Sequence, residues 1–456
     1  MDLNKTKKIH FVGIGGIGVS AVAKMMLEMG KIITGSNLSE SIVTQDLEKL
    51  AVKIFYQHQA DNIASDVDLL IYSPAVPDDN PERARARELH IPELSYPEFL
   101  GEFSKNKFTV AVSGTNGKST TTAILGLILE QAGLDPTVIV GSCLSQWNGN
   151  LRLGHSKYFV VEACEWRAHM LNLSPQMIVL TNLEEDHLDY YRDLNHIIVT
   201  FQQYVDKLNP DDLLILNNDD VNLKKLKTHS RVITYGITQS ADIMATNIKT
   251  GPGYQRFDLI SERFQLKTTL TIKVPGLFNI YNFLAAIAGV LALGASTQSI
   301  NKVAKSFIGI WRRFEVHDLK IEHCKLKIVS DYAHHPTAVK DTIKAAQEFF
   351  PGRRVVAVFQ PHHHNRTKRL FNDFVDGFQG AEVVIISEIY DVAGREESDD
   401  QNISSLDLVQ AIKAKYPSQE IFYTPDLIRT KQKLLSLIQP NDVVLVMGAG
   451  DIYTIF

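Results

Sequence analysis

The sequence predicts an α/β protein of three domains, each built on a largely parallel sheet covered by helices. Its 456 residues exceed what one hydrophobic core usually supports. Strand-like apolar runs alternate with helical patterns in three successive segments, as in parallel sheets. A glycine-rich loop follows the first strand of the first two segments. We therefore expect a Rossmann-like N-terminal domain at residues 1–105, a central P-loop ATPase-like α/β domain at 106–310, and a C-terminal Rossmann-like α/β domain at 311–456.

The first domain is expected to alternate strands and helices up to a polar boundary at 101-GEFSKNKF-108. Helical patterns run through Met26 and again near residues 45–50. The predicted strands are 9-IHFVG-13, 31-KIITGS-36 and 68-DLLIYS-73.

The second and third domains continue the alternation. The central domain opens with 109-TVAVSG-114 and a helix from Ser119, and 268-TTLTIKV-274 alternates as an antiparallel edge strand does. Buried, β-branched runs predict the remaining strands. These are 158-YFVVEA-163, 177-MIVLTN-182, 213-LLILNN-218 and 231-RVITYG-236 in the central domain, then 326-LKIVSDYA-333, 354-RVVAVFQP-361, 382-EVVIISEIY-390, 420-EIFYTP-425 and 443-VVLVMGAG-450 in the third.

Composition indicates a cytoplasmic enzyme that binds neither nucleic acid nor membrane. The net charge is -5, whereas nucleic-acid-binding proteins usually concentrate Lys and Arg. Three scattered cysteines form no CxxC pair, so neither a disulfide framework nor a cysteine zinc site is expected. The N-terminus lacks the apolar region of a signal peptide. The longest apolar stretch, residues 283–295, is too short to span a membrane and is expected to be a buried helix.

The first glycine loop, 13-GIGGIG-18, follows a strand and fits the GxGxxG pattern of diphosphate-binding loops. Gly13, Gly15 and Gly18 supply that pattern, although glycine also serves close packing of a helix on a strand. A dinucleotide site usually adds an acid at the end of the next strand for the ribose. Asn37 stands there instead. A nucleotide diphosphate is therefore favoured over packing alone, and NAD or NADP is disfavoured.

The second glycine loop, 114-GTNGKST-120, has the order strand, loop, helix of a triphosphate site. Val112 stands where the strict GxxxxGK[ST] pattern has its first glycine. Gly114 and Gly117 permit tight turns, Lys118 can reach the terminal phosphates, and Ser119 can bind Mg²⁺. The alternative is a glycine turn that happens to precede Lys-Ser, and the order of elements disfavours it.

Two strand ends in the central domain supply candidate Mg²⁺ ligands. Glu162 and His187 are each expected to end a predicted buried strand, and the two strands are expected to be neighbours. The carboxyl ends of parallel strands gather at one edge. The acids of 184-EEDHLD-189 are also consistent with a solvated turn. The imidazoles of His334, His335 and His362–His364 form two clusters that could bind a transition metal, but they lack cysteine or strand-end carboxylates in zinc spacing. We therefore favour polar substrate contacts and surface positions for them.

In this order, GTNGKST, Glu162, 181-TNLEEDHLD-189, 276-GLFNIYN-282, 312-RRFE-315 and 331-DYAHHPT-337 resemble the Mur ligase family. The resemblance covers essentially the whole chain. It implies a three-domain, ATP-dependent ligase of peptidoglycan precursor synthesis that forms an amide bond through an acyl phosphate, with Mg²⁺. It further implies small-molecule substrates and a monomer or weak homodimer.

The resemblance also implies a role for each matching residue. The second loop would hold ATP, and the first would hold the UDP of a sugar substrate. Lys118 and Arg313 would offset negative charge, and His334 would be the base. The implied ATP contacts are Gly114, Thr115, Asn116, Gly117, Lys118, Ser119, Thr120, Asn279, Asn282, Arg313 and Asp331. The implied UDP-sugar contacts are Gly13, Gly15, Gly16, Gly18, Asn37 and Ser73. Tyr332, His334 and Arg366 would face the acyl phosphate and amino acid, and Ser119, Glu162 and His187 would bind the metal.

Three other functions stay open at this point. Within the family, a recycling ligase attaches a tripeptide to the same sugar, but 359-FQPHHHNRT-367 favours a member that adds a single amino acid. A nicotinamide-dependent oxidoreductase built on the first loop leaves GTNGKST, Glu162 and His187 unexplained. A non-catalytic ATP-binding module is disfavoured because lysine, serine, glutamate and histidine candidates are all present.

Overall fold

The computed structural model describes residues 3, 5–187, 190–321, 324–391 and 403–456. The chain forms two compact units, and each is described by itself. The first comprises Met1–Glu184, Asn195–Thr234 and Ala285–Ser299. The second comprises Glu185–Leu194, Tyr235–Leu284 and Ile300–Phe456.

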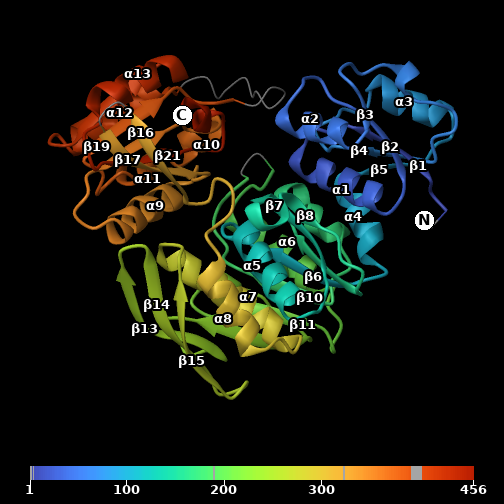
Figure 1. The fold of residues 1–456 in the computed structure, drawn as a ribbon, viewed down its shortest axis with the longest axis horizontal. Helices are drawn as coiled ribbons and strands as arrows, with labels where there is room; N and C mark the ends of the chain where they lie inside the picture. Colours follow the sequence, from blue (N-terminus) through green and yellow to red (C-terminus); the bar gives the residue numbers. More distant parts are fainter. Residues whose placement is uncertain (1–2, 4, 188–189, 322–323, 392–402) are drawn as a thin grey trace. The chain divides into compact units, whose positions relative to one another are not determined.

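The first unit begins with a five-stranded parallel sheet in the order β3-β2-β1-β4-β5 (Figure 1, blue). Its strands are β1 (Lys8–Val12), β2 (Ile32–Ser36), β3 (Lys53–Phe55), β4 (Leu69–Tyr72) and β5 (Glu93–Ser95), and its helices are α1 (Ile17–Glu28), α2 (Ile42–Lys49), α3 (Pro81–Glu88) and α4 (Tyr96–Ser104). The predicted strands and helices of this segment are confirmed. The sequence did not predict β3 and β5, because three residues are too few to show a periodicity.

A second, larger set of strands in the first unit has the order β12-β11-β10-β6-β9-β7-β8. Its strands are β6 (Phe108–Ser113), β7 (Thr137–Leu144), β8 (Gly149–Arg152), β9 (Tyr158–Glu162), β10 (Met177–Leu180), β11 (Leu213–Asn217) and β12 (Arg231–Gly236), the last two residues of which belong to the second unit. The neighbouring helices are α5 (Lys118–Gln131) and α6 (Leu194–Val205). Strand β6 is parallel to both of its neighbours, β9 and β10. The five strands predicted here are confirmed, and the β7–β8 hairpin was not predicted.

The helix expected from the apolar stretch at 283–295 is α7 (Leu277–Ala292), which is followed by α8 (Thr297–Ser306). Phe283, Leu284 and Ile287 have no exposed surface. A helix that is apolar on all sides is stable only when it is enclosed by protein. No helix in the described part of the chain has both the length and the apolar content needed to cross a membrane.

The second unit contains an antiparallel ribbon of β13 (Ile243–Gly251), β14 (Tyr254–Ser261) and β15 (Leu266–Ile272). This confirms the antiparallel edge that the alternation of residues 268–274 predicted. Along β14, buried residues alternate with more exposed ones. One face of the ribbon is therefore packed and the other faces solvent.

The second unit also contains a six-stranded sheet in the order β16-β17-β21-β18-β19-β20 (Figure 1, orange to red). Its strands are β16 (Glu315–Ile321), β17 (Cys324–Asp331), β18 (Val355–Phe359), β19 (Val383–Ser387), β20 (Glu420–Thr424) and β21 (Val443–Met447), and its helices are α9 (Pro336–Phe349), α10 (His364–Arg369), α11 (Phe371–Asp376), α12 (Ser405–Lys415) and α13 (Leu427–Leu437). Five strands are parallel, as predicted. The unpredicted strand β16 pairs antiparallel with β17.

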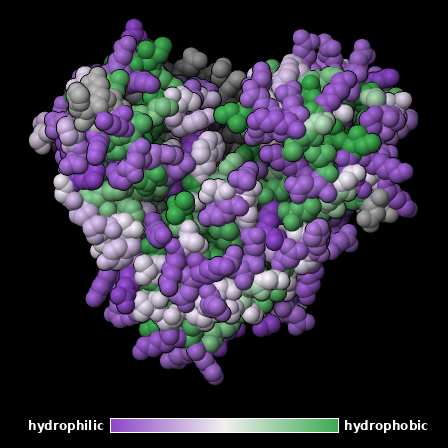
Figure 2. Space-filling model, viewed as in Figure 1, coloured by the Kyte–Doolittle hydropathy of each residue, from purple (hydrophilic) through white to green (hydrophobic). Residues whose placement is uncertain are grey.

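The surface in Figure 2 shows hydrophilic residues interspersed with hydrophobic ones. Some large apolar side chains are well exposed, among them Leu38, Ile42 and Ile428. Exposed apolar side chains are ordinary on protein surfaces.

The N-terminal sheet encloses a buried polar network centred on Glu82 of α3. The Glu82 side chain is fully buried and accepts hydrogen bonds from Ser36 Oγ at 2.6 Å and from Asn62 Nδ2 at 2.5 Å. His58 Nδ1 lies 2.9 Å from it, and His10 Nε2 lies 3.6 Å away. Burial raises the pKa of Glu82, but these hydrogen bonds outweigh it and leave the pKa below its usual value.

We predict that Glu82→Ala lowers the free energy of unfolding by about 3 kcal/mol, because it leaves buried donors without their acceptor. Since the folded pKa is depressed, the carboxylate stabilises the fold above the unfolded pKa of about 4.5, and this stabilisation is lost as pH falls through the lower folded pKa. Urea denaturation across pH 3–7 should therefore show a weaker acid dependence for Glu82→Gln than for wild type. The matched control is Glu88→Gln at an exposed site of the same helix. Equal acid dependence in Glu82→Gln and wild type would contradict this account.

Candidate active site

The first glycine loop connects β1 to α1 and is closed by the end of β2. The amides of Gly13 and Ile14 donate to the Ser36 carbonyl at 2.9 and 3.0 Å, and Gly15 N donates to Asn37 Oδ1 at 3.2 Å. Asn37 therefore binds the loop itself through its side chain. No side chain caps the N-terminus of α1, so its first amides can receive an anion.

Ser73 lies on the other side of the same loop. Its amide donates to the Val12 carbonyl at 2.9 Å, and a β-carbon on Gly13 would come within 3.0 Å of Ser73 Cβ. Gly13 also has φ 75°, a conformation that favours glycine. The structure thus brings the loop glycines, Asn37 and Ser73 together at one sheet edge.

The second glycine loop connects β6 to α5, whose first residue is Lys118, one residue before the predicted start. Gly117 has φ 83° and Gly114 has φ 133°. A β-carbon on Gly114 would lie 2.2 Å from Thr181 Oγ1, so only glycine fits between the loop and the end of β10. Ser119 and Thr120 are buried in the first turn of α5.

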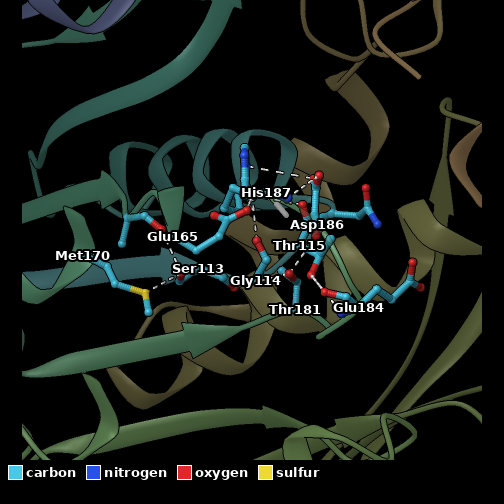
Figure 3. A network of polar contacts seen from close by, with 12 residues as sticks. Ser113, Gly114, Thr115, Glu165, Met170, Thr181, Glu184, Asp186 and His187 are labelled. Carbon is cyan, nitrogen blue, oxygen red and sulfur yellow. Dashed lines mark hydrogen bonds and ion pairs between the residues drawn. The ribbon is translucent and has the colours of Figure 1, made fainter. Parts of the chain in front are cut away.

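The end of β10 holds this loop through hydrogen bonds (Figure 3). Asn182 receives the Asn116 amide on Oδ1 at 2.9 Å and donates from Nδ2 to the Asn116 carbonyl at 3.0 Å. Thr115 Oγ1 receives the Glu184 amide at 2.9 Å. Thr181 Oγ1 donates to the Asn116 carbonyl at 2.7 Å. The loop is therefore fixed by a neighbouring strand end and by its own turns.

The Lys118 ammonium has three oxygen partners. Nζ donates to the carbonyls of Gly114 and Thr115 at 2.6 and 2.9 Å and to Glu165 Oε1 at 2.8 Å. Burial lowers the pKa of Lys118, but the neighbouring carboxylates, Glu165 foremost, outweigh it and raise the pKa above its usual value. Lys118 is thus held as a cation at the phosphate loop. Sequence reasoning missed Glu165, although the second acid of 162-EACE-165 just beyond a strand end could have indicated it.

Glu162 ends β9, as predicted, and its carboxylate receives the Gly141 amide from β7 at 2.9 Å. The placement of His187 needs a correction. Strand β10 already ends at Leu180, so His187 lies in the following loop, in the second unit. The strands β9 and β10 are also not neighbours, because β6 pairs with both. The sequence cannot show this, because strand order in a sheet is set by crossover connections.

The acidic segment after β10 is only partly a solvated turn. Glu185 is exposed, but Asp186 is buried and forms an ion pair with Arg366 Nη2 at 2.8 Å within the second unit. Burial raises the pKa of Asp186, but the Arg366 guanidinium outweighs it and holds the pKa well below its usual value. Asp189 lies outside the described residues.

In the second unit, Tyr332, His334 and Arg366 lie together. His334 Nδ1 is 2.8 Å from the Tyr332 carbonyl, and the His334 ring is 6.1 Å from that of His362, whose carbonyl accepts from Arg366 Nη1 at 3.4 Å. Burial and then the Arg366 charge lower the pKa of His334 well below its usual value. In the cluster His362–His364, the other two histidines lie near Asp391. His364 Nδ1 is 2.6 Å from Asp391 Oδ2, and His363 Nδ1 is 3.9 Å from Asp391 Oδ1.

Asp331 is the last residue of β17, and Arg312 and Arg313 come just before β16 of the same sheet. Both Asp331 oxygens accept backbone amides, Oδ2 from Phe314 at 2.6 Å and Oδ1 from Ala333 at 2.7 Å. Arg313 is half-buried, with its guanidinium 4.8 Å from the Tyr332 ring. Arg312, which sequence reasoning did not single out, is buried and donates from Nη2 to the carbonyls of Gly448 and Gly450.

The two asparagines predicted to flank the adenine lie at the start of α7. Both are buried. Asn279 Nδ2 donates to the Pro275 carbonyl at 2.7 Å, and Asn282 Nδ2 donates to Asn279 Oδ1 at 3.1 Å. The structure thus places them side by side.

Three family models match consecutive parts of the chain. They are described as "Mur ligase family, catalytic domain" at residues 8–108, "Mur ligase middle domain" at residues 112–290, and "Mur ligase, glutamate ligase domain" at residues 312–450.

Curated relatives and solved structures match from end to end. The UDP-N-acetylmuramate–L-alanine ligase of Acetivibrio thermocellus is 39% identical over 100% of this chain and 96% of its own, and that of Alkaliphilus metalliredigens is 40% identical over 100% and 97%. A crystal structure of UDP-N-acetylmuramate-alanine ligase from Thermotoga maritima has a TM-score of 0.82 at 30% identity, covering 98% of this chain and 97% of that one. A murein peptide ligase from Psychrobacter arcticus shares the fold, with a TM-score of 0.73 at 22% identity over 98% and 97%.

We predict that Lys118 and Glu165 are energetically coupled. Glu165→Ala should lower the free energy of unfolding by about 1–3 kcal/mol, because it leaves a mostly buried ammonium without its carboxylate. In the Lys118→Ala background the same substitution should cost less, because no ammonium remains to be left unpaired. Urea denaturation of the four proteins of this cycle measures the coupling. Additive effects of the two substitutions would show that the ion pair does not contribute.

Proposed function

The chain belongs to the Mur ligase family, and we propose that it joins L-alanine to the lactyl carboxylate of UDP-N-acetylmuramate, with cleavage of ATP to ADP and phosphate. The observation that carries this proposal is the end-to-end match, at about 40% identity, to curated ligases of that name. The Lys118 loop supplies the site that such chemistry needs. We retain the three domains at 1–105, 106–310 and 311–456. Both ATP and a UDP-sugar are cytoplasmic metabolites, so we place the reaction in the cytoplasm.

The proposed reaction has two steps, because a carboxylate is a poor electrophile. An oxygen of the lactyl carboxylate attacks the γ-phosphorus of ATP, and ADP leaves, which gives an acyl phosphate. The alanine amine then attacks the acyl carbon, and phosphate leaves from the tetrahedral oxyanion. Both steps concentrate negative charge, and we assign its stabilisation to the cations Lys118 and Arg313.

We assign His334 as the base that accepts the proton of the attacking amine. Its Nδ1 lies 2.8 Å from the Tyr332 carbonyl, which can only accept, so Nδ1 carries the hydrogen and Nε2 has the free lone pair. The lowered pKa of His334 keeps the ring neutral near pH 7, as a proton acceptor must be. Arg366, oriented by Asp186, would bind the acyl phosphate or the alanine carboxylate nearby.

The donor set also fits Mg²⁺. Ser119 offers a hydroxyl at the start of α5, Glu162 a half-buried carboxylate at the end of β9, and His187 a half-buried imidazole. Oxygen ligands completed by water are what Mg²⁺ prefers, and a neutral imidazole can join them. When bound, the ion would neutralise charge on the phosphates of ATP.

The first glycine loop is assigned to the UDP-sugar. Its free amides at the α1 N-terminus suit a diphosphate. Asn37 closes the loop where a dinucleotide site has its ribose carboxylate, so nothing here favours a nicotinamide cofactor. In this assignment the first loop binds the UDP of the sugar substrate and the second loop binds ATP.

The proposed function predicts phosphate release from ATP that requires both UDP-N-acetylmuramate and L-alanine. Lys118→Ala should reduce this rate at least tenfold, because a phosphate-binding charge contributes several kcal/mol in the transition state. The matched control is Lys105→Ala, which removes an exposed lysine that pairs with Glu102. Release that requires a tripeptide in place of alanine would identify the recycling reaction instead. Activity in Lys118→Ala above about a tenth of wild type would refute the role of that lysine.

The metal assignment predicts that Glu162→Gln and His187→Ala raise the Mg²⁺ concentration needed for half-maximal phosphate release. Excess Mg²⁺ should restore part of the rate, because each variant loses one of several ligands. Glu185→Gln, at an exposed acid close to His187 in sequence, serves as the control. A variant with wild-type turnover and unchanged Mg²⁺ dependence would remove that residue from the ligand set.

A further inference from the structure

Tyr96 is the first residue of α4, directly after β5. Its position is well fixed. Ser95 caps the helix by accepting the Glu98 amide at 3.4 Å, and Glu98 Oε2 receives the Ser95 amide at 2.7 Å. Pro97 stiffens the same turn. None of the motifs found in the sequence includes Tyr96.

The ring of Tyr96 lies against the first turn of α1, at the third glycine of the first loop. A β-carbon on Gly18 would come within 2.6 Å of Tyr96 Cζ and 2.8 Å of its hydroxyl oxygen. Gly18 is helical, so its backbone conformation does not call for glycine. Glycine is required at this position because the Tyr96 ring occupies the space that a side chain would need. The third glycine of GxGxxG therefore makes room here for a phenol beside the diphosphate-binding turn.

The same turn of α1 is hydrogen-bonded to the set of strands that contains β6 to β12. Asn150 of β8 is buried and donates from Nδ2 to the Ile17 carbonyl at 2.7 Å. On the neighbouring strand β7, Gly141 donates its amide to Glu162. The turn of α1 against which Tyr96 packs is thus joined to the hairpin that also binds Glu162.

The Tyr96 hydroxyl is available as a donor. The structure records no hydrogen bond from it to any residue that is described. Burial, followed by the nearby charge of Glu162, raises the pKa of Tyr96, so the phenol stays protonated at every physiological pH. A protonated phenol suits an anionic oxygen, because hydrogen bonds to charged acceptors are the stronger ones.

We propose that the Tyr96 hydroxyl donates a hydrogen bond to an anionic oxygen of the sugar-diphosphate substrate at the first glycine loop. This inference rests on the proposed function, because it takes the UDP-sugar as the ligand of that loop. Tyr96 is then a substrate-positioning residue, and it acts on the sugar substrate alone.

The test is Tyr96→Phe, which removes one oxygen and keeps the ring against Gly18. The KM for UDP-N-acetylmuramate should rise about tenfold, as expected for a lost hydrogen bond to a charged group. The KM values for ATP and L-alanine should stay within about twofold of wild type. The matched control is Tyr56→Phe, also in the N-terminal sheet region, whose hydroxyl bonds Thr44 and Glu48. It should leave all three KM values unchanged.

An unchanged KM for the sugar in Tyr96→Phe would overturn the proposal, and so would an equal rise in all three KM values with a lowered melting temperature. Titration calorimetry with UDP-N-acetylmuramate alone separates this result from the proposed function, since it requires no turnover. A protein that binds the sugar, loses about tenfold affinity in Tyr96→Phe and yet releases no phosphate would support the Tyr96 contact and refute the ligase.

A second cycle tests the packing on which the proposal depends. Gly18→Ala should lower the melting temperature in the wild-type background, because the methyl group meets the Tyr96 ring. In the Tyr96→Ala background the same change should cost little, because the ring is gone. An equal cost in both backgrounds would show that Tyr96 does not occupy this space, and would overturn the proposal.

Discussion

The parallel pairing of β6 with both β9 and β10 is the constraint on which the site of the first unit depends. Parallel neighbours point their carboxyl ends to one edge, so whatever follows each of these strands meets the loop after β6. Asn182 after β10 can therefore hold the loop by two hydrogen bonds, and Glu165 after β9 can pair with Lys118. This close approach also restricts the loop sequence, because the end of β10 leaves no room for a β-carbon at Gly114.

Two ion pairs in this protein each orient a functional cation. Lys118 with Glu165 and Arg366 with Asp186 follow the same arrangement, in which a mostly buried carboxylate holds a cation in place. Such pairs add little net stability, because desolvation offsets much of their attraction. Their value lies in geometry, since a cation fixed before the substrate arrives need not be reorganised during the reaction.

The sequence allowed much of the architecture to be predicted, because the relevant signals are local. Strand and helix periodicity located most of the longer elements, and the antiparallel ribbon was visible in the alternation of residues 268–274. Elements of three residues, such as β3 and β5, carry no readable period. The strands β7, β8 and β16 were also missed. The sequence of β16, Glu315–Ile321, mixes polar and apolar residues, and its pairing with β17 is a tertiary contact.

For the candidate site, the residue types of the two loops and the order of the motifs, which identifies the family, can be read in the sequence. The partners of these side chains become visible in the folded chain alone. The structure showed that Asp186 is buried against Arg366, that His187 lies beyond its strand, and that Tyr96 fills the space left by Gly18. The physical reason is that a loop motif is written in consecutive residues. Burial and pairing depend on strand order and on contacts between residues up to 180 positions apart, which no local pattern encodes.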